Sequence, residues 1–185
     1  AKYDEINEDL WVKIRDGIID KDFLRKHRFY DTFLHFGIDD EQLAQYFEKH
    51  FLDEIINFNE LIPQTIEVLE YLKEKGYQLH VVSNGFHEVT NRKVEKSGLK
   101  KYFETVTSAE DAHAMKPDER IFEYSLNLAN AEKSESIFIG DDWVADVKGA
   151  QNFGLDIIFF DALKENKTEE GLKTIQNLEE IKNFL

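Results

Sequence analysis

The sequence contains no cysteine, and this absence excludes several kinds of chemistry. Disulfide bonds, a thiolate nucleophile and zinc sites built on cysteine are impossible. No apolar run approaches the ~20 residues that a membrane-spanning helix needs. Basic residues are outnumbered, with 23 Lys and Arg against 38 Asp and Glu, for a formal net charge of −15. This charge disfavours duplex nucleic acid as a partner, because phosphate backbones require clustered Lys and Arg.

What remains is the composition of a globular protein, with 42% hydrophobic and 33% charged residues over 185 positions. This length allows one core of average size and a small accessory unit. We therefore expect a cytoplasmic protein without a membrane partner, whose ligand is a small molecule; the oligomeric state stays open. The chain starts at Ala1, inside an amphipathic pattern, and its only methionine is Met115. From this we expect a segment before Ala1.

Residues 1–61 carry only helical periodicity. An amphipathic pattern runs to Ile14, and a second helix is expected to begin at Asp20. Asp39 and Gln42 resemble a capping box, which predicts the start of a third helix. No strand-like alternation appears in this stretch, so we predict a small helical unit over 1–61.

From Pro63 onward, short apolar strands alternate with helices. The strands are expected at 77–82, 105–108, 137–139 and 157–160. The helices are expected at 63–75, 87–97, 118–129, 144–153 and 178–184. This alternation predicts an α/β unit over 62–185, with a parallel sheet covered by helices on both faces.

The most informative segment follows the strand expected at 137–139. The strand stops at Gly140, and two adjacent acids, Asp141 and Asp142, come directly after it. A third acid, Asp146, lies one helical turn later. Carboxylates at the end of a buried strand are costly unless something neutralises them. Mg²⁺ would do so, because it prefers oxygen ligands and often shares its coordination shell with a phosphate.

Two further polar groups follow predicted strands. Ser83-Asn84-Gly85 offers a hydroxyl and backbone N–H donors at the start of a helix, and Lys116 offers an ammonium group. In parallel sheets the carboxyl ends of the strands share one rim, where ligands bind. Each group alone also has an ordinary explanation as a turn, a solvated loop or a helix cap. Together, in this order, they indicate a phosphate-handling site.

This conjunction resembles the haloacid dehalogenase (HAD) superfamily of phosphatases, in which a strand-end Ser or Thr, a Lys and a Gly-Asp motif follow one another. Residues 82–86 and 139–146 look most like the YjjG/YfnB-like branch, whose characterised members include pyrimidine 5′-nucleotidases. The resemblance covers nearly the whole chain. It implies a Rossmann-like parallel-sheet core over 62–185 and a small all-helical cap of the C1 type over 1–61.

The resemblance also implies roles for the site residues. The phosphoryl group would be bound by the Ser83 hydroxyl, by the backbone of the next two residues and by Lys116. The adjacent acids would serve Mg²⁺, with Asp141 as a direct ligand, and the third acid would hold the lysine or a metal-bound water. The implied residues are Ser83, Asn84, Gly85, Lys116, Asp141, Asp142 and Asp146.

One departure from the family pattern is serious. HAD phosphatases attack with the first Asp of an Asp-x-Asp-x-Thr motif on their first strand, and the second Asp is the general acid/base. The only superficial match is Asp20-Lys21-Asp22, which lacks the Thr and which we interpret as a helix start. The nucleophile, the acid/base, one metal ligand and the first core strand are therefore missing, and residues 1–185 alone would be inactive.

Three functions remain in view. The leading hypothesis is a Mg²⁺-dependent phosphomonoester hydrolase that forms an aspartyl-phosphate, with a nucleoside 5′-monophosphate as substrate. The first alternative is a dehalogenase of the same fold, which the crowded acids disfavour because its chemistry needs no metal. The second is a catalytically inactive HAD-like binding domain, supported only by the missing first motif. Aromatic residues of the helical unit would either stack on a base or form its core: Trp11, Phe29, Tyr30 and Phe36.

Overall fold

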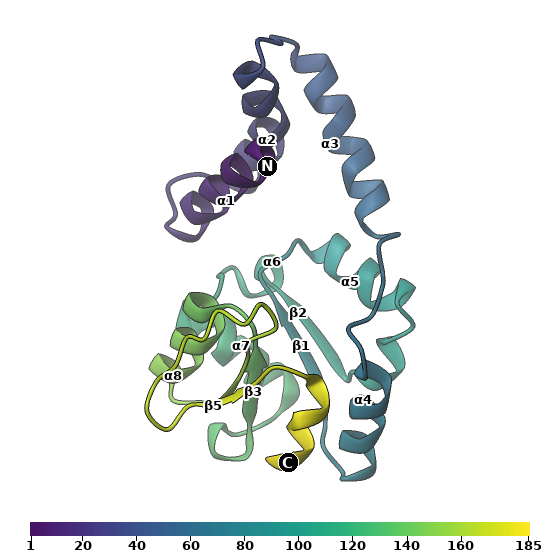
Figure 1. The fold of residues 1–185 in the computed structure, drawn as a ribbon, viewed down its shortest axis with the longest axis vertical. Helices are drawn as coiled ribbons and strands as arrows, with labels where there is room; N and C mark the ends of the chain where they lie inside the picture. Colours follow the sequence, from purple (N-terminus) through teal and green to yellow (C-terminus); the bar gives the residue numbers. More distant parts are fainter. The chain divides into compact units, whose positions relative to one another are not determined.

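The computed structural model describes residues 1–185, which form two compact units (Figure 1). The first unit is Ala1–Phe58 and the second is Asn59–Leu185. The sequence places this division three residues later, at 61/62. None of the helices combines the length and the apolar character that crossing a lipid bilayer requires.

Three helices make up the first unit: α1 (Lys2–Arg15), α2 (Lys21–His35) and α3 (Glu41–Ile55). Helix α2 packs against both of the others. Phe29 is buried between them and its ring contacts Phe51 at a centroid distance of 5.5 Å. A buried ion pair also joins α2 to α3, in which Arg28 donates to both Glu48 oxygens at 2.6 and 2.7 Å. The all-helical character predicted for this stretch is confirmed.

Aspartates cap two of these helices. Asp20 Oδ1 accepts the backbone N–H of Phe23 at 2.8 Å, so the interpretation of this residue as a helix start is confirmed. The predicted cap at Asp39 is wrong. Asp40 caps α3 by accepting from the backbone of Leu43, while Asp39 accepts the Tyr30 hydroxyl. Two consecutive aspartates at a helix start satisfy the same sequence rule, and only the backbone geometry selects between them.

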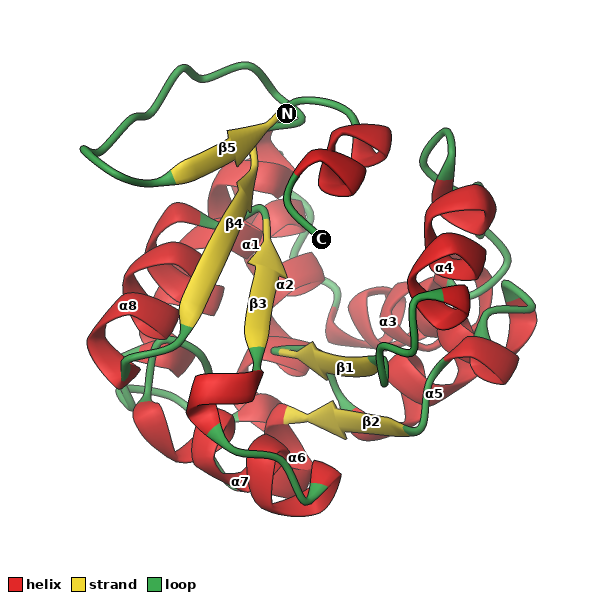
Figure 2. Cartoon of the chain, turned by 90° about the horizontal axis from the view of Figure 1, so that it is seen from below, coloured by secondary structure: helices red, strands yellow, loops and turns green.

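Five strands lie in the second unit, and every pair of them is parallel. They are β1 (His80–Ser83), β2 (Thr105–Ser108), β3 (Ile137–Gly140), β4 (Asp156–Phe160) and β5 (Lys173–Ile175). β1 pairs with β2 in one sheet, and β3, β4 and β5 follow in that order in the other (Figure 2). The predicted parallel α/β fold is confirmed, although its strands form two sheets and not one.

The division into two sheets leaves β1 and β3 each with a single strand neighbour. Their burial differs accordingly from that of β4, which has a neighbour on both sides. Every residue of β1 and of β3 is only partly buried, whereas the last four residues of β4 are buried. Two polar backbone edges are therefore available for pairing in the core of the fold.

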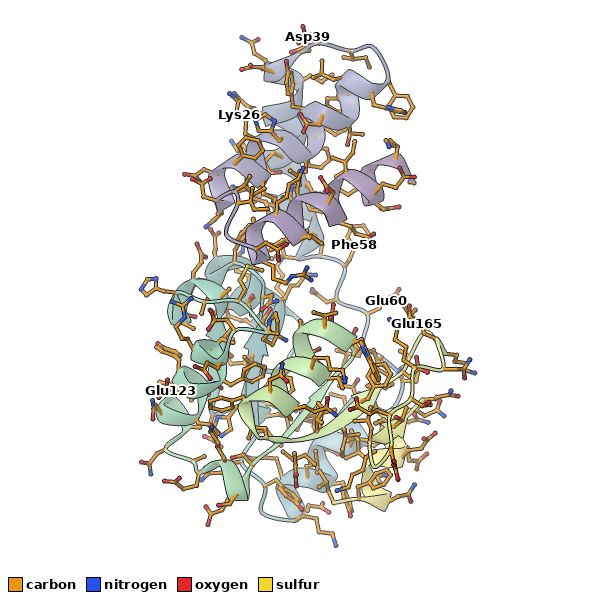
Figure 3. All side chains as sticks on the ribbon, turned by 90° about the vertical axis from the view of Figure 1, so that its left-hand side faces the viewer. Lys26, Asp39, Phe58, Glu60, Glu123 and Glu165 are labelled. Atoms are coloured by element: carbon orange, nitrogen blue, oxygen red, sulfur yellow. The ribbon has the colours of Figure 1, made fainter.

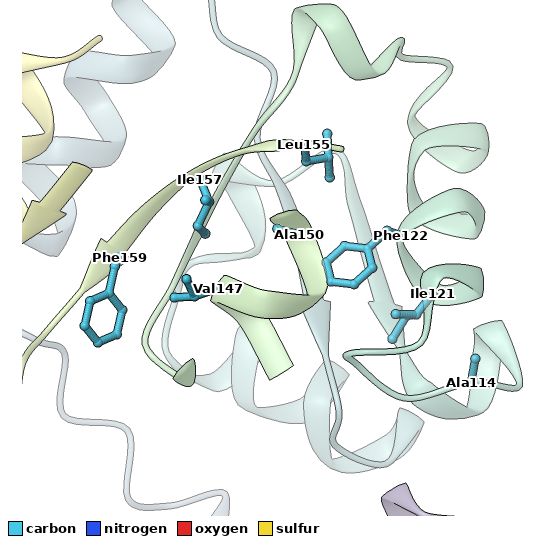
Figure 4. Close-up of a cluster of buried hydrophobic side chains, with 8 residues drawn as sticks. All are labelled: Ala114, Ile121, Phe122, Val147, Ala150, Leu155, Ile157 and Phe159. Carbon is cyan, nitrogen blue, oxygen red and sulfur yellow. The ribbon is translucent and has the colours of Figure 1, made fainter. Parts of the chain in front are cut away.

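Helices cover both faces of the larger sheet, as the sequence predicts. Ile157 and Phe159 of β4 join one apolar cluster, which the close-up shows together with Phe122 (Figure 4). Ile158 and Phe160 of the same strand face a second cluster. The alternation along one strand places one core on each side of the sheet.

The helices of this unit are α4 (Thr65–Glu74), α5 (His87–Lys96), α6 (Ala109–Ala112), α7 (Glu119–Ala129) and α8 (Gly149–Phe153). Short 3₁₀ segments span Lys100–Tyr102, Lys133–Glu135 and Leu178–Asn183, and a π-helix spans Trp143–Lys148. The single helix predicted at 144–153 is therefore a π-helix followed by α8, and the predicted last helix is 3₁₀. Periodicity does not resolve segments of only three or four residues, so the sequence does not predict strand β5 or helix α6.

Candidate active site

Ser83 is the last residue of β1, and its hydroxyl faces the turn that follows the strand. Its oxygen accepts the backbone N–H of Gly85 at 3.0 Å and lies 3.4 Å from the donating Thr90 hydroxyl of α5. A β-carbon at position 85 would come within 2.7 Å of the Thr90 oxygen and 3.1 Å of the Ser83 oxygen. Glycine is required here because a side chain would displace both hydroxyls. Sequence reasoning did not identify Thr90, and its only signal is its position in the first turn of the helix that follows the motif.

Asn84 ties this turn to the loop that carries Lys116. Its side-chain oxygen accepts the Lys116 backbone N–H at 2.7 Å, and its Nδ2 donates to the Lys116 carbonyl at 3.0 Å. This two-bond clamp explains why an amide stands here, since one side chain both accepts and donates. The sequence predicted a backbone role for Asn84, and its side-chain role was not foreseen.

The Lys116 ammonium lies at the carboxyl ends of β1 and β3. Nζ donates to Asp146 Oδ1 at 2.6 Å and to the Val82 carbonyl of β1 at 3.1 Å, and it lies 5.4 Å from the ring centre of Phe138 in β3. Its side chain is 11% exposed and that of Asp146 only 4%. A buried pair of this kind requires good geometry, because each charge has lost its hydration. Both sheets thus contribute to the surroundings of one ammonium group.

Asp146 also fixes the backbone after β3. Its Oδ2 accepts the N–H groups of Asp141 and Asp142 at 3.1 and 3.0 Å. A β-carbon at Gly140 would come within 2.5 Å of this carboxylate. The glycine before the acids is therefore explained by the close approach of Asp146.

Asp142 caps the π-helix. Its Oδ1 accepts the backbone N–H groups of Val144 and Ala145 at 2.8 and 2.7 Å. Carboxylates are well suited to this position, where helix N–H groups lack partners. The prediction that Asp142 serves a metal stays a prediction, and one of its oxygens is already committed to the cap.

The Asp141 carboxylate has no ion-pair partner and is exposed to solvent. Desolvation by the surrounding protein and then the nearby Asp146 charge raise the pKa of Asp141, and Lys116 opposes this. An unpaired carboxylate in such surroundings fits a Mg²⁺ ligand, because a divalent ion would offset both effects. No group of three or more His, Asp or Glu side chains is placed to hold a metal, so water or substrate oxygens would complete its shell.

The residues predicted from the sequence thus form one connected network. Ser83 and its turn are joined to Lys116 through Asn84, and Lys116 is joined to the Asp141 loop through Asp146. The arrangement offers a hydroxyl, a fixed ammonium and an available carboxylate at one rim. These are the groups that phosphoryl transfer requires for positioning and charge neutralisation.

Comparison with known proteins agrees with this chemistry. The chain is 25% identical over 187 residues to the pyrimidine 5′-nucleotidase YjjG of Escherichia coli, covering 99% of the chain and 80% of that protein. It is 32% identical over 111 residues to a ribulose-1,5-bisphosphate 5-phosphatase of Halopiger xanaduensis, covering 60% of the chain and 46% of that protein.

The fold is similar to that of the putative HAD-hydrolase YfnB of Bacillus subtilis, solved bound to magnesium. The TM-score is 0.89 at 24% identity, over the whole chain and 80% of YfnB. The family model of the haloacid dehalogenase-like hydrolases matches residues 20–160. The chain described here belongs to the haloacid dehalogenase-like hydrolases.

Proposed function

We propose that this chain carries the phosphate-binding part of a Mg²⁺-dependent phosphomonoester hydrolase that acts on a nucleoside 5′-monophosphate. One observation carries the proposal: the Lys116 ammonium, held by Asp146, lies at the carboxyl ends of β1 and β3, between the loops that bear Ser83 and Asp141. The nucleotidase relative supports this class of substrate, and the phosphatase relative supports only the hydrolysis of a phosphate ester.

The free donors of the site suit a phosphoryl group. The Ser83 oxygen accepts from Gly85, so its own hydrogen is available to a phosphate oxygen. Lys116 has three N–H donors, of which one binds Asp146 and one binds the Val82 carbonyl. The third is available to the substrate. Asp146 keeps the ammonium in place, and it acts through Lys116 and not on the substrate.

Mg²⁺ is the implied metal, and bound near Asp141, with Asp142 beside it, it would neutralise charge on the phosphoryl oxygens. This chain contributes the unpaired Asp141 carboxylate on a loop that Asp146 fixes through two backbone hydrogen bonds. The ligand is therefore held in position without a further side chain.

The Asp-x-Asp-x-Thr motif, which would supply the nucleophilic carboxylate and the general acid/base, has no match in the loops of this rim. Asp20 caps α2, in the other unit of the chain. In this proposal both groups stand on a strand outside residues 1–185 that pairs with the open edges of β1 and β3. Residues 1–185 alone are then expected to bind phosphate without hydrolysing the ester through an aspartyl-phosphate.

The test is phosphate release from nucleoside monophosphates by the full-length protein, in Mg²⁺ and in EDTA. We expect phosphate release in Mg²⁺ and none in EDTA. Lys116→Met should lower the rate of release about 100-fold or more, since a fixed charge at the reacting group is lost. Lys101→Met, which removes an exposed lysine, is the matched control. No release from any monophosphate would refute the proposal.

Assays on the same protein preparation distinguish this function from the two alternatives. A dehalogenase would release halide from a 2-haloacid in EDTA, and the available Asp141 carboxylate argues against this metal-free chemistry. A non-catalytic domain would bind phosphate, but even the full-length protein would not release phosphate from a nucleoside monophosphate.

A further inference from the structure

A histidine stands beside the Ser83 turn, on the β2 side of the rim. His87 begins α5, four residues after Ser83, and its side chain is 58% exposed. Its Nδ1 lies 2.7 Å from Asp111 Oδ1, and its backbone N–H donates to Glu110 Oε2 at 2.6 Å. None of these contacts is needed to hold Lys116 or Asp141, so the site described above does not account for this group.

Asp111 ties the imidazole to the end of β2. Its Oδ2 accepts the backbone N–H and the hydroxyl of Ser108, at 2.8 and 2.6 Å. Ser108 is the neighbour of Ser83 in the parallel register, about 4.8 Å away across the sheet. The imidazole is therefore tied, through Asp111, to the residue that neighbours Ser83 across the β1–β2 pair.

The hydrogen bond to Asp111 defines what the other ring nitrogen can do. A carboxylate only accepts, so Nδ1 carries the hydrogen in the neutral ring and Nε2 presents a lone pair. Asn91 Nδ2 lies 3.4 Å from Nε2, but its shorter bond, 2.9 Å, goes to the His87 carbonyl. Nε2 is therefore suited to accept a hydrogen bond from a hydroxyl group.

The charges around His87 restrict the ligand further. Three acids face or adjoin it, namely Asp111, Glu110 and Glu88, and the last pairs with Arg92 at 3.1 Å. A second anionic group of a substrate would meet like charges here, which disfavours its binding. A neutral hydroxyl meets no such penalty.

We propose that His87 is a substrate-positioning residue, whose Nε2 accepts a hydrogen bond from a neutral hydroxyl in the alcohol part of a sugar-type phosphomonoester. The inference rests on the proposed function and narrows it. Sugar and nucleoside monophosphates are accepted, and substrates with a second phosphate are disfavoured.

The test measures binding by calorimetry to residues 1–185 in Mg²⁺, with inorganic phosphate and ribose 5-phosphate as probes. His87→Asn keeps a donor toward Asp111 but lacks an atom at the Nε2 position. It should weaken ribose 5-phosphate binding about two- to tenfold, the worth of one hydrogen bond, and leave phosphate binding unchanged. His87→Gln places an amide near the Nε2 position and should restore part of the affinity. His50→Asn, in the helical unit, is the control.

A second readout is the ring resonances of the six histidines, of which His87 should shift with ribose 5-phosphate and not with phosphate. Equal affinity of the wild type and His87→Asn for ribose 5-phosphate, with phosphate binding intact, overturns the role of His87 and leaves the phosphate site standing. Tighter binding of ribulose 1,5-bisphosphate than of ribose 5-phosphate also overturns it. If neither probe binds the wild type, the proposed function fails and this inference fails with it.

Discussion

Gly140 controls the geometry of the site through its lack of a side chain. In Gly140→Ala the new methyl group would fall within 2.5 Å of the Asp146 carboxylate, which cannot move without releasing Lys116. Forcing an extra carbon into such a packed position costs about 1–3 kcal/mol. We expect that loss in the free energy of unfolding, measured with urea.

Gly37→Asn is the control for this variant. Position 37 has open space around it and a φ of +78°, a conformation that Asn adopts more readily than other residues with a side chain. It should lose less stability than Gly140→Ala, and the reverse order would contradict the role given to the Asp146 contact.

Asp141 is expected to lower stability when no metal is bound. Partial desolvation by the surrounding protein and then the Asp146 charge raise the pKa of Asp141 in the folded protein, so the folded state holds its proton at pH values where the unfolded state has lost it. The unfolding free energy therefore falls as pH rises from about 3.9, the usual Asp pKa, through the raised folded value. Asp141→Asn removes this loss and should raise the melting temperature at pH 7 in EDTA.

The difference in melting temperature between Asp141→Asn and the wild type should shrink to near zero below the usual Asp pKa, where the carboxyl is protonated in both the folded and the unfolded state. Asp156→Asn removes the same charge at the exposed first residue of β4 and is the matched control. A destabilised Asp141→Asn at pH 7 would show that the carboxylate is not under strain in the metal-free protein.

At the residue scale, the sequence is a better guide to which side chains lie close together than to the hydrogen bonds that each of them makes. Ser83, Lys116 and Asp146 lie at or after the ends of strands, and strand ends in a parallel sheet share a rim. The Asn84 side-chain clamp depends on the backbone of Lys116, 32 residues away, and the Asp142 cap depends on where the π-helix begins. Such contacts follow from loop conformation, which carries no periodic signal.

At the scale of elements, the Lys116–Asp146 pair joins the loop between α6 and α7 to the π-helix that follows β3. Removing one partner leaves an uncompensated buried charge, which costs about 3–5 kcal/mol. We expect Lys116→Met to lose this amount in urea unfolding. The double variant Lys116→Met/Asp146→Asn should recover part of it, since the Asn oxygen still accepts from the 141 and 142 backbone.

The exposed pair Lys13–Asp9 in α1 is the control, with side chains 42% and 60% exposed. Its removal should cost less than about 1 kcal/mol. If the unfolding free energies lost by the two single variants at Lys116 and Asp146 simply add up to the loss of the double variant, the pair does not couple the α6–α7 loop to the π-helix.

Helices of ten residues or more and four of the five strands were predictable, whereas the shortest helical segments, such as Lys100–Tyr102 and Ala109–Ala112, were not. The strand at Thr105–Ser108 and the helix that ends at Ala129 match their predicted bounds closely. Strand β1 begins three residues later than predicted, at His80, because an apolar run does not reveal where strand pairing starts. Nor does the sequence reveal that β1 and β3 lie in different sheets with no strand paired to both, since strand order is set by tertiary packing.

At the scale of the whole molecule, the chain is two compact units joined by an irregular segment. Phe58 and Glu60 lie on this segment (Figure 3). The change from helical periodicity to alternating strands and helices predicted the two kinds of unit, and the placement of the boundary differs by three residues. That the helical unit serves as a cap stays a proposal.

The joining segment is expected to be the first site of proteolysis in the full chain. Residues 57–64 form no helix or strand, and Phe58 is 78% exposed. Brief digestion with chymotrypsin should cut after Phe58 and give fragments of 58 and 127 residues, because a protease needs an exposed, extended segment. Leu163, which is 84% exposed in the loop after β4, offers an internal comparison. Mass spectrometry distinguishes the two cuts, and first cleavage inside α2 or the β-sheets would contradict the division into two compact units.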